Sequence, residues 1–104
     1  MNADPDPIPA VIARDLFDPK GSPAASASAV ADVVVGLLRS HERVRVSFES
    51  LHGISSAYFN TLLLRLVQIL GPQAVSSRIE FSTDSRAQRV AWDRSWSAVV
   101  GRTA

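Results

Sequence analysis

The chain has 104 residues, of which 46% are hydrophobic, a formal net charge of +1 and no cysteine. This length suits one compact domain with its own core, and the lack of cysteine excludes zinc–thiolate sites, thiol catalysis and disulfide cross-links. The near-neutral charge offers no basic surface for nucleic acid, and no apolar run approaches the roughly 18 residues of a membrane span. We therefore expect a cytoplasmic domain that does not cross a membrane.

The first nine residues, MNADPDPIP, combine three prolines with two aspartates. Such a composition is typical of a disordered lead-in, so we place the folded domain at residues 10–104. Residues 11–17 are the first predicted strand, and DPKGSP at 18–23 is a turn. Its last two residues suit the start of a helix, with Ser22 as the N-cap and Pro23 at the first helical position.

A helix is predicted over residues 24–40, because apolar residues recur there at positions i, i+3, i+4, i+7 and i+8. These residues are Val30, Val33, Val34, Leu37 and Leu38. The stretch VRVSF at 44–48 alternates with a period of two and predicts a second strand.

The strongest helical pattern follows the loop 49–56, and Gly71-Pro72 ends it in the order expected of a helix C-terminus. Its apolar stripe consists of Phe59, Leu62, Leu63, Leu66, Val67 and Leu70. Residues 79–82 alternate again and predict a third strand. A last helix is predicted over 86–100, capped by Thr83-Asp84-Ser85 and carrying Trp92 and Trp96 on its packed side.

The predicted order is β-α-β-α-β-α in one α/β domain, with a small, mostly parallel or mixed sheet. Right-handed crossovers place the loops after the strands, including loop 49–56, at one edge of the sheet, where open α/β sheets usually bind ligands. Polar residues alternate with apolar ones in the later strands, whereas strands covered on both faces are continuously apolar. These polar residues are Arg45, Ser47, Arg78, Glu80 and Ser82. We therefore expect helices mainly on one face of the sheet.

The stretch VRVSFESLHGISSAYFNTLLLRL resembles the strand–loop–helix signature of STAS domains, the fold of bacterial anti-sigma factor antagonists. It is more similar still to a STAS-like family of unknown function, which has an Ile-Ser-Ser loop and an aromatic residue one turn into the helix. The resemblance covers about residues 10–100 and is specific over about 25 of them. It implies a STAS-like fold and a regulatory, protein-binding role.

In anti-sigma factor antagonists this loop reads Asp-Ser-(Ser/Thr)-Gly, and its first Ser is phosphorylated by a partner related to histidine-kinase ATPases. Alignment on Ile54 places the corresponding acceptor at Ser56. The preceding Asp corresponds to Ser55, and the Gly two positions after the acceptor corresponds to Tyr58. The resemblance therefore implies Ser56 as the candidate phosphorylation site.

Two interpretations of the paired serines stay open. Either serine can cap the following helix by accepting a bond from a free N–H group of its first turn. The same helix N-terminus would also stabilise a phosphate on Ser56. Glu49, His52 and a serine do not make a hydrolase signature, and no metal-ligand spacing or nucleotide-binding motif is present, so we expect no catalytic residues, metal or cofactor.

The sequence thus predicts a non-enzymatic regulatory module that binds a protein. The partner implied by the resemblance is a histidine-kinase-like ATPase, a serine kinase or an anti-sigma-type regulator, and not nucleic acid. The predicted partner-binding residues are His52, Gly53, Ser55, Ser56, Tyr58 and Asn60, with Tyr58 and Asn60 at the exposed start of the helix. One alternative is a structural STAS-type subunit of a larger complex. Another is a small-ligand or nucleotide site lined by Gly53, Ser55, Ser56 and Asp84.

Overall fold

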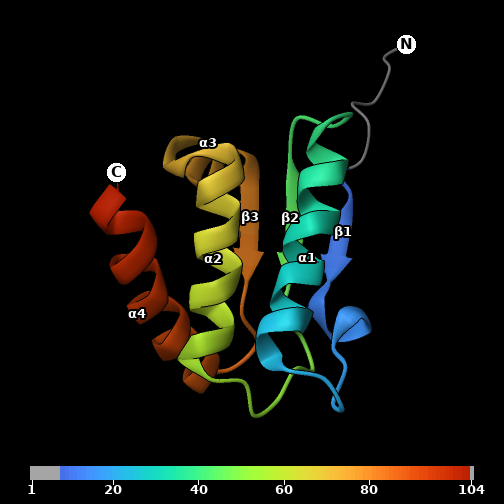
Figure 1. Cartoon of the computed structure of the whole chain (residues 1–104), viewed down its shortest axis with the longest axis vertical. Helices are drawn as coiled ribbons and strands as arrows, with labels where there is room; N and C mark the ends of the chain where they lie inside the picture. Colours follow the sequence, from blue (N-terminus) through green and yellow to red (C-terminus); the bar gives the residue numbers. More distant parts are fainter. Residues whose placement is uncertain (1–7, 104) are drawn as a thin grey trace.

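Three short parallel strands, joined by helices, make up the part of the chain that the computed structural model describes, residues 8–103 (Figure 1). The elements in chain order are β1 (Ala10–Ile12), the 3-10 helix η1 (Ala13–Leu16), α1 (Pro23–Leu38), β2 (Val44–Ser47), α2 (Ser56–Leu70), α3 (Pro72–Arg78), β3 (Ile79–Ser82) and α4 (Arg86–Thr103). This order agrees with the predicted β-α-β-α-β-α series, with η1 and α3 as additions. No helix between residues 8 and 103 combines the length and the apolar character that a bilayer crossing requires.

The sheet has the strand order β1-β2-β3, with β2 in the centre and all pairs parallel. Val46 pairs with Val11 on one side and with Phe81 on the other, and all three face the helices. On the opposite face, Arg45 is paired with Glu80, and their side chains lie 3.4 Å apart. Figure 1 shows α1 and α2 in front of the sheet, so the prediction of helices mainly on one face agrees with the structure.

Helix α1 begins as predicted. The Ser22 side chain accepts a hydrogen bond from the N–H of Ala25 (3.1 Å), and Pro23 is the first helical residue. Its buried stripe differs from the predicted one, because Val33 is 39% exposed while Ala27 and Ala31 are fully buried. The small alanines allow α1 to lie close to its neighbours, whereas Val33 faces away from them.

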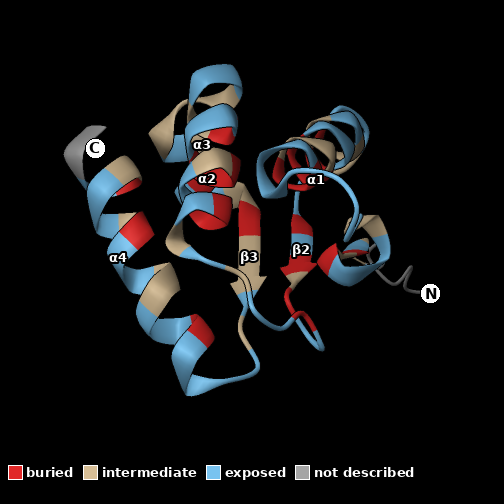
Figure 2. Cartoon of the chain, turned by 60° about the horizontal axis from the view of Figure 1, so that its bottom comes forward, coloured by how far each residue is buried: buried red, intermediate tan, exposed pale blue. Residues whose placement is uncertain are grey.

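Helix α2 buries the predicted residues Phe59, Leu62, Leu63 and Leu66 completely. Gly71 ends it with a φ of 87°, a left-handed conformation that glycine adopts without strain, and its N–H donates to the Val67 carbonyl. Contacts with α1 on one side and α4 on the other place α2 in the middle of the helical layer (Figure 2).

The structure differs from the prediction at the end of the first strand and after Gly71. The first strand ends at Ile12, and residues 13–16 form η1, closed by a bond from the Phe17 N–H to the Arg14 carbonyl (3.1 Å). Residues 72–78, for which no element was predicted, form α3, because Pro72 suits a first helical position after the turn at Gly71. The predicted disordered lead-in lies outside the described residues up to position 7, and the Pro9 carbonyl accepts a bond from the N–H of Arg45 (2.9 Å).

Arg78 was expected on the open face of the sheet, and the structure places it elsewhere. It ends α3, and its guanidinium donates hydrogen bonds to the backbone carbonyls of Leu38, His41 and Glu42, each 2.9 Å long. These carbonyls belong to the C-terminal end of α1 and the turn that follows, where a cation is favoured by the helix dipole. Arg78 therefore fastens the end of α1 to the segment that enters β3.

Candidate functional site

The loop between β2 and α2 lies at the C-terminal edge of the sheet, as the topology predicts (Figure 1). Leu51 anchors it in the core with 3% exposure, while His52, Gly53 and Ser55 are exposed. Gly53 has a φ of 72°, which accounts for a glycine at this turn. The loop thus presents a short polar surface above a buried leucine.

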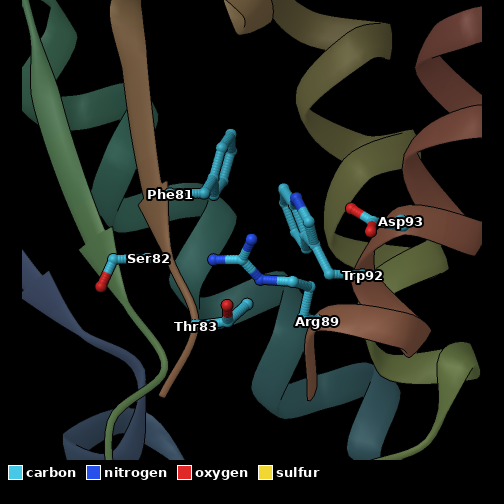
Figure 3. A pocket seen from close by; sticks show the side chains of 6 residues that line it. All are labelled: Phe81, Ser82, Thr83, Arg89, Trp92 and Asp93. Carbon is cyan, nitrogen blue, oxygen red and sulfur yellow. The ribbon is translucent and has the colours of Figure 1, made fainter. Parts of the chain in front are cut away.

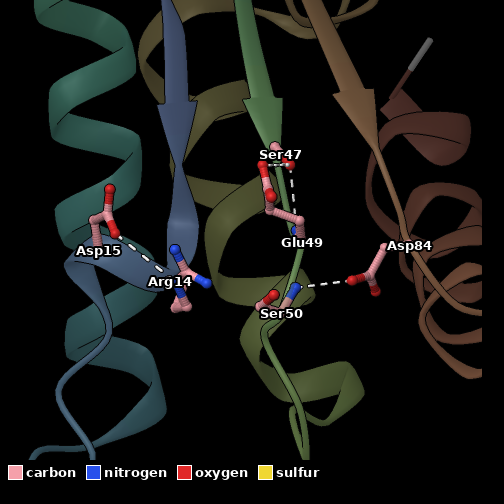
Figure 4. Close-up of polar contacts among 6 residues, drawn as sticks. All are labelled: Arg14, Asp15, Ser47, Glu49, Ser50 and Asp84. Carbon is pink, nitrogen blue, oxygen red and sulfur yellow. Dashed lines mark hydrogen bonds and ion pairs between the residues drawn. The ribbon is translucent and has the colours of Figure 1, made fainter.

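Ser50 adopts a positive φ of 57°, which is uncommon for a residue other than glycine. Its N–H donates a 2.8 Å hydrogen bond to a carboxylate oxygen of Asp84, the residue two positions before α4 (Figure 4). On the other side of Ser50, the Glu49 N–H donates to the Ser47 hydroxyl (3.2 Å). Asp84, predicted as part of a helix cap, therefore holds the left-handed turn of this loop in place.

Gln88 is the strongest link between the loop and α4, and no prediction named it. Its side chain is buried, with a residue exposure of 6%, and its amide nitrogen donates to the carbonyls of Phe48 (2.8 Å) and Leu51 (2.7 Å). Its amide oxygen accepts from the N–H of Asp84 (2.9 Å). The sequence held one signal, since Gln88 lies one helical turn before Trp92, on the packed side of α4. A buried polar residue with all its groups paired fixes a single loop conformation.

The side chains of the two candidate serines do not cap α2. Ser55 occupies the N-cap position but makes no side-chain capping bond, and only its carbonyl is used, accepting from the N–H of Tyr58 (3.1 Å). Ser56 is the first helical residue and is half-buried, and its carbonyl accepts from the Ser95 hydroxyl (3.3 Å). Neither serine hydroxyl bonds to another residue of the described chain, so the predicted side-chain cap is wrong.

Tyr58 was predicted to be exposed and to contact a partner, and this is wrong. The residue is fully buried, and its ring packs edge-on against Phe59 with the centroids 5.7 Å apart. The Arg65 guanidinium bonds Asp32 of α1 at 2.9 Å, so this side of α2 turns toward α1. Residues seven apart lie on the same face of a helix, and Tyr58 therefore faces α1 as well. Its hydroxyl has no hydrogen-bond partner, and burial raises the pKa of Tyr58 to about 12.

Asn60 is exposed, as predicted, and Leu64 one turn later is 50% exposed. Both lie on the outer side of α2, and Leu64 is one turn further from the loop than Asn60. We call His52, Ser55, Asn60 and Leu64 the loop surface. Ser56 lies half-buried at the edge of this surface.

The residues of the predicted ligand site do not line a common pocket. Gly53 and His52 line a pocket of about 150 Å³ with Gln88, while Asp84 lines a different pocket beside Arg86. The first volume is below the roughly 300–1,000 Å³ of typical small-molecule sites. Neither pocket includes Ser55 or Ser56.

The groups that a hydrolytic or metal site needs are not assembled at this loop. The Glu49 carboxylate accepts from the Ser47 hydroxyl (3.4 Å), and no bond joins it to His52. Across residues 8–103, no three acidic or histidine side chains are grouped so that they could hold a metal ion.

Comparison of the chain with known proteins finds no matching family model, no matching curated protein and no matching solved structure. The likeness to STAS domains therefore rests on the sequence of residues 44–66.

Proposed function

We propose that this protein is a non-enzymatic, regulatory protein-interaction module of STAS-like type that binds its partner through the loop surface. The observation that carries this proposal is the loop itself, which is exposed at its tip yet fixed by Asp84 and Gln88 at its base. A surface that is ordered before binding loses less conformational entropy when it binds, and this favours recognition.

The composition of the loop surface supports a protein partner. The loop surface combines three exposed polar side chains, His52, Ser55 and Asn60, with one exposed apolar side chain, Leu64, one helical turn beyond Asn60. Protein–protein interfaces likewise combine apolar and polar residues. Its place at the carboxyl edge of a parallel sheet also agrees with where α/β domains commonly present their binding residues.

Phosphorylation of Ser56 is the regulatory step that we propose for this surface. The Ser56 hydroxyl makes no bond to the described chain and lies at the N-terminus of α2, whose positive dipole end favours a phosphate. A phosphate would add nearly two negative charges at the edge of the loop surface and would oppose a partner that had fitted the uncharged form. The resemblance implies that the partner is a histidine-kinase-like ATPase, a serine kinase or an anti-sigma-type regulator.

Site-specific photo-crosslinking in the host tests the binding surface. A photoreactive residue at position 52 or 60 should capture a defined protein, whereas the same residue at Gln73, exposed on α3 at the other end of the molecule, should not. Capture of the same protein with equal yield from all three positions would contradict the proposed surface.

The captured protein then tests the switch. Ser56→Asp should weaken its binding at least tenfold, and Ser56→Ala should preserve it, because only the first variant adds charge. Gln73→Asp, which adds a negative charge at an exposed position on α3, outside the loop surface, is the control for a non-specific charge effect and should leave the affinity unchanged. Equal affinities of the two Ser56 variants would refute the switch while leaving the binding surface intact.

A further inference from the structure

At the β3 edge of the sheet, a helix extends beyond the last strand. Within the described chain β3 pairs only with β2, and α4 packs along α2 on the outer side of β3. Figures 1 and 2 show α4 beyond the last strand, with no strand of the described chain beneath it. The helical layer therefore extends past the last strand of the sheet, by the width of α4.

Aromatic side chains line the space between β3 and α4. Phe81 of β3 lies 4.4 Å from Trp92 and 6.0 Å from Trp96, measured between ring centroids. All three remain only half-buried, although each packs on the core, where Phe48 contacts both Phe81 and Trp92. An aromatic cluster left partly in water at a sheet edge would gain from further burial.

A pocket of about 390 Å³ opens at the C-terminal end of this space (Figure 3). Its lining residues are Phe81, Ser82, Thr83, Arg89, Trp92 and Asp93. Figure 3 shows the Arg89 side chain extending from α4 toward β3, between Phe81 and Thr83. The guanidinium of Arg89 forms no ion pair with any residue that the structure describes. The end of the space between β3 and α4 therefore carries a cation without an ion pair, and the Asp93 carboxylate of the same pocket lies on the other side of Trp92 (Figure 3).

The backbone of β3 is oriented to accept another strand. The Ser82 carbonyl accepts a bond from the Phe48 N–H (3.0 Å), so the backbone groups of Ser82 point toward β2. Because successive residues of a strand point their backbone groups in opposite directions, the N–H and carbonyl of Phe81 point outward from the sheet. An unpaired edge of this kind is a template for strand addition.

We propose that β3 and α4 together receive an extended segment of a partner protein as a fourth strand of the sheet. The segment has apolar side chains at alternate positions, which pack against Phe81, Trp92 and Trp96. It carries an Asp or Glu at the end beside Thr83, where that carboxylate pairs with Arg89. Because the Arg89 guanidinium extends toward β3 while Asp93 lies on the other side of Trp92, charge complementarity favours an occupant that is acidic where it passes β3 and Arg89.

A second copy of the chain fits this edge less well than an extended segment. Pairing β3 with the β3 of another molecule would bring two α4 helices, each extending past its own sheet edge, over the same strip of the joined sheet. The space between β3 and α4 is also distinct from the loop surface, so the proposal stands independently of the function proposed above. Ser56→Asp should leave binding at β3 unchanged.

A displayed library of random peptides about ten residues long, selected on the full chain, provides the probe. The expected consensus alternates apolar and polar residues and ends in Asp or Glu. The consensus peptide is then synthesised and added to the protein while backbone amide hydrogen exchange is measured. The Phe81 amide should become protected on binding, whereas the Ser82 amide, which already faces β2, should change little.

The matched variants are Arg89→Glu and Arg94→Glu, two exposed arginines of α4 of which only Arg89 lines the pocket. Arg89→Glu should weaken the peptide roughly five- to tenfold and reverse the preference for an acidic end, and Arg94→Glu should change the affinity less than about twofold. The proposal is overturned if no consensus is selected, or if a bound peptide leaves Phe81 exchange unchanged. It is equally overturned if Phe81 is protected in the free protein in a concentration-dependent manner, which would indicate a second copy as the occupant.

Discussion

Raising the pH above about 10 should destabilise this protein through one residue, Tyr58. Its hydroxyl is fully buried without a hydrogen-bond partner, and burial raises the pKa of Tyr58 to about 12, against an ordinary value of about 10 in the unfolded chain. The folded state therefore holds the phenolic proton at a pH at which the unfolded state has released it. Stability is fully present below pH 10 and is lost as the pH rises toward 12.

The magnitude follows from the two pKa values. One pKa unit corresponds to about 1.4 kcal/mol, so the free energy of unfolding should fall by roughly 3 kcal/mol across this range. Arginine side chains and Lys20 also titrate at high pH. The quantity to compare is therefore the difference between the native protein and Tyr58→Phe, which lacks the phenol and should not show this fall.

Tyr58 is the only tyrosine in the chain, so the ultraviolet absorbance of tyrosinate reports on it alone. The absorbance should rise with a midpoint well above 10 while circular dichroism shows the chain folded, and near 10 in denaturant. At neutral pH, Tyr58→Phe should be more stable than the native protein by about 1–3 kcal/mol, because the variant removes an unsatisfied buried hydroxyl. A folded-state midpoint near 10, or a destabilised Phe variant, would show that the hydroxyl reaches water or has a partner, and would refute the reasoning.

Three further predictions, each for a different residue, can be checked by denaturant unfolding, the last of them also by amide exchange. Ser22→Ala should cost about 1 kcal/mol and Ser55→Ala less than about 0.5, because only the Ser22 hydroxyl accepts a bond in the first turn of its helix; similar costs would contradict this. Arg78→Ala should lower the free energy of unfolding by about 2–3 kcal/mol, because it leaves three backbone carbonyls without their donor. Arg45→Ala removes an exposed ion pair and should cost at most about 1 kcal/mol. The reverse ranking would contradict the role of Arg78 in holding the end of α1. Gln88→Ala should cost about 2–4 kcal/mol and speed amide exchange at Ser50 to Gly53; an unchanged exchange rate there would mean that the loop does not depend on Gln88.

The buried Tyr58 changes how the family resemblance is to be interpreted. The alignment places it where anti-sigma factor antagonists have a glycine, near the start of the helix. The structure makes it part of the contact between α2 and its neighbours, and a residue with no exposed surface cannot touch a partner. The binding surface that we propose therefore leaves out Tyr58 and includes Asn60 and Leu64, which are exposed.

The sequence alone determined the elements that depend on local repetition. A period of 3.6 residues located α1 and α2, and a period of two located β2 and β3 and indicated that one face of the sheet is polar. Short-range signals also located helix ends, at Ser22 and Gly71. These signals are readable because the interacting groups lie within a few residues of each other in the chain.

Only the tertiary structure decided the roles of Arg78, Gln88 and Tyr58. Arg78 binds carbonyls 36 to 40 residues earlier, and Gln88 binds carbonyls 37 and 40 residues earlier. Tyr58 lies beside the main stripe of α2, and whether such a position is wet or dry depends on whether another helix covers it. Packing between elements that are distant in sequence sets these environments, and no local periodicity records it.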